Sequence, residues 1–355
     1  MTHQVDEAKS RQLRSLGESL DRLITIDLTG RSVIHALHRA ARERQGDEPL
    51  SSRAARSLVE RVGPRDVVLI STGMPVGTLP SAEQDGPVGA ATLARSLVIG
   101  LSATPVVVTE ERNVPLMTDS LRSAGLYVLP VEIARSQPTG SSVISFPLDS
   151  AAAPQASRAI LDTLRPKALV AIERAGANER GEHHAALGRN LTAHNSKQDV
   201  MFEMARESGV LTICIGDGGN ELGCGMIRDA VIAAVPVAAR CRCPCGGTVV
   251  PAFVPDVLIM ASVSNWGAYA IEAGIAAAVE RPEALHDRDV DLRVHTVAAL
   301  AGANNDGPRL LDPGTDAVPA RYHGHLLELM AELVKSSADL GGLYRSDKWP
   351  WVHHR

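Results

Sequence analysis

Residues 215–225, IGDGGNELGCG, combine five glycines with two carboxylates, Asp217 and Glu221. The segment begins at the end of an apolar run, VLTICIGD (210–217), and this run predicts a buried strand. Glycine lets a backbone approach a small ligand closely, and carboxylates are oxygen ligands that suit Mg²⁺ or Mn²⁺. Taken alone, Asp217 is equally well explained by a turn or a helix cap, and Glu221 by the first turn of a helix. We interpret the segment as an acidic, metal-assisted small-molecule site.

A phosphate cradle fits this segment poorly. A dinucleotide fingerprint would need glycine at position 221, where the chain has glutamate. The Walker phosphate loop, the G-x-S-x-G elbow and the H-E-x-x-H zinc motif are also missing from the sequence. The formal net charge of -5 comes without a basic, aromatic-rich stripe. We therefore expect no nucleotide cofactor and no nucleic-acid partner.

Further candidate residues follow other apolar runs. Glu173 ends ALVAIE and precedes Arg174; a structural Glu–Arg contact is the alternative interpretation. Because ligands bind outside the carboxyl ends of parallel strands, we expect these residues to converge on one edge of a sheet. The other candidates at such positions are Thr72, Gly73, Glu83, Asp85, Ser264, Asn265, Trp266 and Asp306.

Histidines and cysteines receive a simpler interpretation. His183, His184 and His194 lie in a polar segment and are predicted to be exposed loop residues rather than metal ligands. Cys241, Cys243 and Cys245 have C-x-C-x-C spacing, not the paired C-x-x-C of zinc ribbons. A soft-metal site is conceivable there, but a small-residue strand entering a Pro/Gly turn is favoured.

Apolar runs alternate with helical patterns along most of the chain. The predicted strands are 66–72, 104–110, 126–132, 168–173, 210–217 and 256–265, and the predicted helices include 87–100, 196–209 and 266–280. This alternation predicts an α/β fold with a mostly parallel, doubly wound sheet, helices on both faces and a helical N-terminal extension.

Three regions are expected from these patterns: a helical extension (1–60), a catalytic α/β domain (61–340) and a C-terminal tail (341–355). Residues 52–66 and 135–142 are predicted to carry loops. The 355 residues contain no apolar run long enough for a membrane helix and no signal-peptide pattern, so we expect no membrane partner and a cytoplasmic location. Whether the chain forms a homo-oligomer is left open.

Several motifs together resemble the D-glutamate cyclase family. They are TGMPVGTLPSAEQDGPVGA, IERAGANERG with GRNL, IGDGGNELGCG, SVSNWGAYAIEA and GANNDG, in the family's order over roughly residues 60–310. The chain departs from the family pattern at Gln84, His183, His184 and Asn190. The resemblance implies an α/β hydro-lyase that cyclises D-glutamate to 5-oxo-D-proline with loss of water, with a divalent metal, Mn²⁺ or Mg²⁺.

The residues are assigned roles on that basis. Asp217 and Glu221 would bind metal or move protons, Glu173 is the alternative base, and Asp85 is a further metal candidate. Arg174 would hold the substrate's α-carboxylate, because a guanidinium can engage both oxygens. The remaining substrate-binding candidates are Thr72, Gly73, Asp85, Gly218, Gly219, Asn220, Ser264, Asn265 and Trp266. The alternatives are a cyclase for another amino acid and a non-catalytic protein that binds one.

Overall fold

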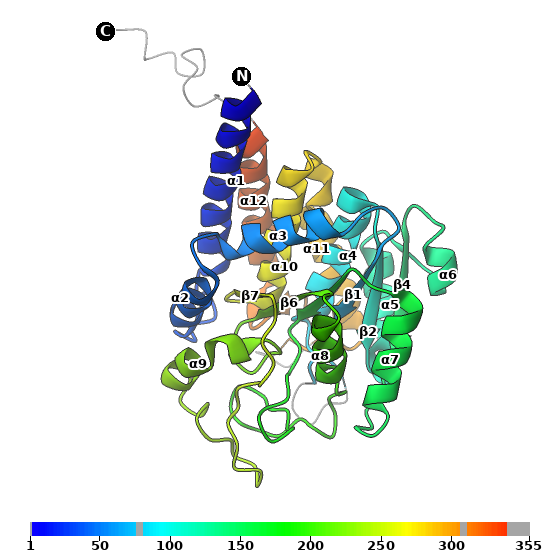
Figure 1. Cartoon of the computed structure of the whole chain (residues 1–355), viewed down its shortest axis with the longest axis vertical. Helices are drawn as coiled ribbons and strands as arrows, with labels where there is room; N and C mark the ends of the chain where they lie inside the picture. The colour runs from blue at the N-terminus through cyan, green and yellow to red at the C-terminus, as the bar shows by residue number, and fades with distance from the viewer. Residues whose placement is uncertain (1, 76–80, 306–310, 339–355) are drawn as a thin grey trace.

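A computed structural model describes residues 2–75, 81–305 and 311–338 (Figure 1). Its centre is a seven-stranded sheet of order β3-β4-β2-β1-β5-β6-β7, in which every pair is parallel. Its strands are β1 (Val67–Ser71), β2 (Thr104–Thr109), β3 (Tyr127–Val128), β4 (Gly140–Ser145), β5 (Ala168–Ile172), β6 (Leu211–Gly216) and β7 (Val257–Met260). A separate antiparallel hairpin joins β8 (Gly314–Thr315) and β9 (Val318–Pro319). The predicted α/β class and parallel sheet are confirmed.

Helices cover both faces of the sheet. In chain order they are α1 (Thr2–Ile24), α2 (Ile34–Gln45), α3 (Leu50–Arg61), α4 (Pro87–Leu101), α5 (Val114–Ser123), α6 (Val131–Ala134), α7 (Ala153–Leu164), α8 (Asp199–Glu207), α9 (Arg228–Ala234), α10 (Ser264–Ala278), α11 (Arg288–Leu300) and α12 (Ala320–Ala338). On one face, α4 and α10 pack against each other and the central strands, while α7 and α8 lie together on the other (Figure 1). The predicted helical N-terminal segment is α1 to α3, and α1 runs beside α12.

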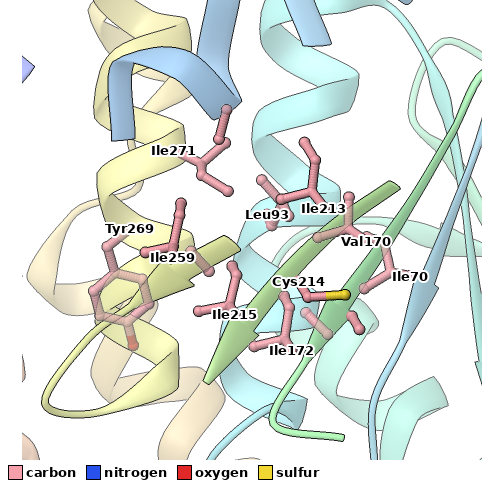
Figure 2. Close-up of a cluster of buried hydrophobic side chains, with 14 of the residues drawn as sticks. Ile70, Leu93, Val170, Ile172, Ile213, Cys214, Ile215, Ile259, Tyr269 and Ile271 are labelled. Carbon is pink, nitrogen blue, oxygen red and sulfur yellow. The ribbon is translucent and has the colours of Figure 1, made fainter. Parts of the chain in front are cut away.

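The core is aliphatic and lies between the sheet and the α4–α10 pair. Figure 2 shows Leu93 of α4 and Ile271 of α10 among Val170, Ile213 and Ile259 from three strands. All five side chains are fully buried. A strand buried on both faces needs an unbroken apolar run, which explains why the runs in this sequence identify β1, β2, β5, β6 and β7.

Some elements differ from the sequence-based prediction. Residues 126–132 hold only the short β3 followed by α6. The loop predicted within 135–142 ends where β4 begins, and β4 itself was not predicted. The composition of β4, GSSVIS, explains why it was missed, because glycine is depleted in strands and serine is common in turns. Residues 52–61 belong to α3, so the loop predicted within 52–66 is limited to residues 62–66.

The strand order places a switch point at the centre of the sheet. The chain builds outward from β1 through β2 to the β3 edge, and then returns to add β5, β6 and β7 on the other side of β1. The connections that follow β1 and β5 therefore lead to opposite sides of the sheet's centre. A crevice at such a point, outside the carboxyl ends of the strands, is where open α/β sheets bind ligands.

Candidate active site

Carboxylates gather at the carboxyl edge beside this switch point. Glu173 follows β5 and Asp217 follows β6, and the register pairs Ile172 with Ile215 just before them. The buried carboxylates of the cluster are Asp85, Glu173, Asp217, Glu221 and Asp316. Oxygens of Asp85, Asp217 and Asp316 lie within 4.8 Å of one another, as do those of Glu173, Asp217 and Glu221. Asp217 is common to both groups and is therefore the centre of the site.

The glycine loop after β6 holds its own glutamate. Glu221 Oε1 accepts from the Gly218 amide at 2.9 Å, and Oε2 accepts from the Gly219 amide at 2.8 Å. A Cβ at Gly216 would lie 2.5 Å from Glu221 Oε2, so this position has room only for glycine. The two amides predicted to contact substrate are therefore occupied by Glu221. Burial and the charge of Asp217 nevertheless raise the pKa of Glu221 to about 7.

Glu173 has an unusual backbone at the end of β5. Its φ of 44° lies in the left-handed region, which non-glycine residues rarely adopt. Strained residues of this kind concentrate at functional sites. The Ser264 hydroxyl donates to Glu173 Oε2 at 2.6 Å. Burial, followed by the charges of Asp217 and Glu221, raises the pKa of Glu173 well above its usual range.

Asp85 lies at the N-terminus of α10. It accepts backbone hydrogen bonds from Ser264 and Asn265, each at 2.8 Å, where the helix dipole favours an anion. Burial and the charge of Asp217 outweigh these bonds and raise its pKa to about 7. The Asn265 amide oxygen accepts from the Gly86 and Gly89 amides at 2.9 and 2.7 Å. Asn265 therefore joins the start of α4 to the start of α10.

Arg31 is a site residue that the sequence analysis missed. It follows Thr29-Gly30 in the break between α1 and α2, yet its guanidinium donates to Asp217 and contacts Asp316 at 2.9 Å. Asp27 shapes this loop by accepting from the Gly30 and Ser32 amides at 2.8 and 2.7 Å. In the sequence, the feature that could have indicated an ordered loop is Asp27 before Gly30, because aspartate near a glycine often organises a tight turn. Nothing in the local sequence predicts that this loop brings Arg31 to Asp217.

Asp316 was also missed. It lies with Ala317 at the tip of the β8–β9 hairpin, and both have positive φ, 55° and 62°. Two-residue hairpins with this backbone usually carry Asn-Gly or Asp-Gly, so Asp-Ala is a weak sequence signal. Burial and the charge of Asp217 raise the pKa of Asp316 well above its usual range. Its Oδ2 atom is buried and accepts no hydrogen bond among the described residues.

Arg174 is fully buried and paired. Its guanidinium binds both Glu110 oxygens, at 3.0 and 2.6 Å, and also donates to the Ser196 hydroxyl at 2.7 Å. The charge of Arg174 overcomes the effect of burial and holds the pKa of Glu110 down at about 2. The predicted contact between Arg174 and a substrate carboxylate stays a prediction, since these partners occupy most of the donors of this guanidinium.

The remaining predicted substrate-binding residues, Thr72, Gly73 and Trp266, differ in their contacts. The Thr72 hydroxyl is buried beside Gly86 and has no hydrogen-bond partner among the described residues. A Cβ at Gly73 would lie 2.7 Å from Thr109 Oγ1, so glycine is required there. Trp266 donates from Nε1 to His323 at 2.8 Å inside the core. Asp306 lies outside the described residues.

The histidine prediction is partly wrong. His183 and His184 are fully buried, whereas His194 is exposed as expected. His183 Nε2 lies 2.7 Å from Asp199 Oδ2, and Asn220 Nδ2 donates to the His184 carbonyl at 3.1 Å. Their polar sequence neighbours suggested exposure, but long-range contacts bury them. Asn220 thus supports the segment that follows β5.

The donor set fits a hard divalent cation. The two oxygen groups around Asp217 supply only carboxylates, which Mg²⁺ and Mn²⁺ prefer. The predicted ligands Asp85 and Glu221 fall in different groups, each with Asp217, and Asp316 is added to the Asp85 group. Arg31 is the counter-charge for Asp217 and Asp316. Several buried carboxylates around one guanidinium leave a deficit of positive charge that protons or a metal ion can offset.

Several clefts open on the surface formed by the described residues. One is lined by Arg61, Arg165, Lys167 and Gly209, residues that precede β1, β5 and β6, so it lies at the amino edge of the sheet, opposite the carboxylates. Among the described helices, none has the length and apolar character needed to cross a membrane.

Comparisons with known proteins identify the family of this chain. The family model described as D-glutamate cyclase-like, C-terminal, matches residues 20–330. The human protein named D-glutamate cyclase, mitochondrial, is 32% identical over 217 residues, which cover 59% of this chain and 32% of that protein. The chain thus spans about a third of that relative's length, and its own cytoplasmic location stays a prediction. The match includes both Arg31 and Asp316 along with the strands between them, and the chain belongs to the D-glutamate cyclase-like C-terminal family.

Proposed function

We propose that this protein is a hydro-lyase that cyclises D-glutamate to 5-oxo-D-proline and releases water. One observation carries the proposal: five buried carboxylates from four segments of the chain cluster with Asp217 at their centre, beside the switch point of the sheet. Family membership supports the reaction class, and the name of the human relative supports the substrate.

The reaction forms one bond and breaks another. The α-nitrogen of glutamate attacks the carbon of the γ-carboxyl group, a C–N bond forms, and a C–O bond of that carboxyl group breaks. The ammonium gives up two protons and the departing oxygen takes up two, so water leaves and the overall charge is unchanged. An enzyme for this reaction has to move protons from nitrogen to oxygen and fold the substrate into a near-attack conformer.

Buried carboxyl groups with raised pKa values suit such proton transfer. In our proposal Asp217, at the centre of the cluster, accepts a proton from the ammonium. Glu173, whose pKa is raised well above its usual range by burial and the neighbouring carboxylates, donates one to the departing oxygen. Glu221, with a pKa raised to about 7, exchanges protons with both. The left-handed backbone of Glu173 and its bond from Ser264 hold the carboxyl group in place.

The substrate's polar ends require partners as well. Arg31 is 35% exposed and faces the cluster, so it can bind a substrate carboxylate from solvent. The Thr72 hydroxyl, which has no hydrogen-bond partner among the described residues, can donate to the same substrate. Asp217 with Asp85 and Asp316, or with Glu173 and Glu221, would hold a Mg²⁺ or Mn²⁺ ion. Such an ion, when bound, offsets the charge of the γ-carboxylate as a Lewis acid.

A product assay tests the proposal. The purified chain is incubated with D- or L-glutamate in Mn²⁺, Mg²⁺ or chelator, and 5-oxoproline is followed by chiral chromatography. We expect 5-oxo-D-proline from the D-isomer, and its loss in Asp217→Asn but not in Asp162→Asn, an exposed control on α7. Turnover of another amino acid would keep the reaction class and change the substrate. Binding without turnover of any amino acid would refute catalysis.

A further inference from the structure

A second cluster of ligand-type side chains lies outside the carboxylate site. Cys241, Cys243 and Cys245 are in the irregular segment between α9 and β7, and His184 precedes Cys243 by 59 residues, in the segment after β5. His184 is fully buried and Cys241 is 8% exposed, while the other two cysteines are half-buried. The four side chains offer one nitrogen and three sulfurs, all within 4.8 Å of one another.

The separations match those of a tetrahedral ion site. Cys241 Sγ lies 3.4 Å from Cys243 Sγ and 3.3 Å from Cys245 Sγ. His184 Nε2 lies 3.3 Å from Cys243 Sγ and 3.8 Å from Cys245 Sγ. A tetrahedral zinc ion with Zn–S of about 2.3 Å and Zn–N of about 2.0 Å places its ligand atoms roughly 3.5–3.8 Å apart. Small shifts of the side chains would therefore accommodate the ion.

We propose that His184, Cys241, Cys243 and Cys245 bind one structural Zn²⁺ ion. Three thiolates and an imidazole are a ligand set that zinc favours and that Mg²⁺ or Mn²⁺ does not. The protein fills all four coordination positions, which is typical of structural rather than catalytic zinc. Sequence spacing alone had favoured a strand and turn, because C-x-C-x-C lacks the usual pattern and its fourth ligand is distant in the chain.

Neighbouring N–H groups suit bound thiolates. Gly247 donates its amide to Cys245 Sγ at 3.4 Å, and Asn190 Nδ2 donates to Cys243 Sγ at 3.6 Å. Three thiolates exceed the charge of Zn²⁺ by one, and hydrogen bonds to sulfur offset that excess.

The ion would connect two irregular segments near the active site. These are the segment after β5 and the segment between α9 and β7. A hydrogen bond from the Arg242 amide to the Gly188 carbonyl, 3.0 Å long, also joins them. Asn220 binds the His184 carbonyl and lies between Asp217 and Glu221 in sequence. Zinc would thus fix the segment against which the carboxylate loop packs. His184 and the cysteines are positioning residues in this scheme, not catalytic ones.

Metal content tests the proposal directly. The full chain is expressed without a polyhistidine tag, purified under reducing conditions and analysed by inductively coupled plasma mass spectrometry. We expect about one zinc per chain, and less than about a tenth of that in Cys243→Ser and His184→Ala. Cys214→Ala, which changes a buried core cysteine, and His194→Ala, which changes an exposed loop histidine, should keep the zinc.

Two further measurements separate the alternatives. Co²⁺ added to zinc-free protein should produce thiolate-to-metal charge-transfer absorption, and this absorption should be absent in Cys243→Ser. Chelation should lower the thermal midpoint of the wild type but not of that variant, because metal binding stabilises the folded state. Zinc that is retained in Cys243→Ser but lost in Asp217→Asn would place the ion among the carboxylates and overturn the proposal. Reduced protein that takes up neither Zn²⁺ nor Co²⁺ would overturn it too.

Discussion

Arg31 donates to Asp217 across 186 residues of sequence, joining the loop between α1 and α2 to the carboxyl end of β6. The N-terminal helices therefore supply the guanidinium of the candidate site. The Ser262 amide donates to the Ile24 carbonyl at 2.7 Å and fixes the base of that loop beside the end of β7. A truncated chain that began at residue 61 would lack this side chain.

Replacing Arg31 should impair turnover. Arg31→Met removes the counter-charge of Asp217 and Asp316 and leaves these two buried carboxyl groups without it. We expect kcat/KM for D-glutamate to fall by about tenfold or more, with partial recovery in Arg31→Lys, because lysine keeps the charge without the planar geometry. The control is Arg39→Met, an exposed position in α2. Equal kinetics in Arg31→Met and Arg39→Met would remove Arg31 from the site.

Replacing Glu173 should separate activity from stability. Glu173→Gln keeps the size of the side chain and removes a proton-transfer group, so kcat should fall by about 10²–10⁴-fold. The same change removes a buried acid that is repelled by Asp217 and Glu221. The thermal midpoint should therefore stay equal or rise. Calorimetry beside the kinetic assay checks both, with exposed Glu132→Gln as control. A large loss of stability would mean that Glu173 is structural.

The Arg174–Glu110 pair should be sensitive to removal of one partner. Both side chains are 1% exposed, and Arg174→Met leaves the Glu110 carboxylate buried without its main counter-charge. Breaking such a pair costs about 3–5 kcal/mol of unfolding free energy. The double variant Arg174→Met with Glu110→Gln should recover part of this loss in denaturant unfolding. An undiminished Tm in Arg174→Met, together with a raised KM, would instead favour the predicted contact with substrate.

His286 should make stability depend on alkaline pH. Burial disfavours its charge, but Glu272 at 2.6 Å and Asp291 at 3.5 Å outweigh that effect and raise its pKa from 6.5 to about 9. A raised folded-state pKa means that the stabilisation is complete below pH 6.5 and is lost as the pH rises through about 9.

The measurement compares Tm for the wild type and His286→Gln from pH 6 to about pH 10. The difference should be largest at the acidic end and shrink toward the alkaline end. His35→Gln, at an exposed position of α2, should leave the profile unchanged. A constant difference across the range would show that His286 acts by packing alone.

Local sequence accounts for much of the sheet and for the carboxylates that follow its strands. Unbroken apolar runs identify strands buried on both faces, and parallel strands bring their carboxyl ends to one edge. This is why Asp85, Glu173, Asp217 and Glu221 could be expected together before their distances were known. Strand β4 could not be expected from the sequence, because its composition, GSSVIS, resembles that of a loop. It is a strand because it pairs with β2 and β3.

Tertiary structure alone decided which other groups meet. Arg31, Asp316 and the His184–cysteine cluster involve partners far apart along the chain, and no local pattern encodes such distances. The same packing determines which hydrogen-bond donors are already used within the protein. The Gly218 and Gly219 amides donate to Glu221, and the Arg174 guanidinium pairs with Glu110. Residue types and their order thus determined the fold class and the acidic character of the site. Its pairing and charge balance depend on long-range contacts, because electrostatic energy depends on separation in space rather than along the chain.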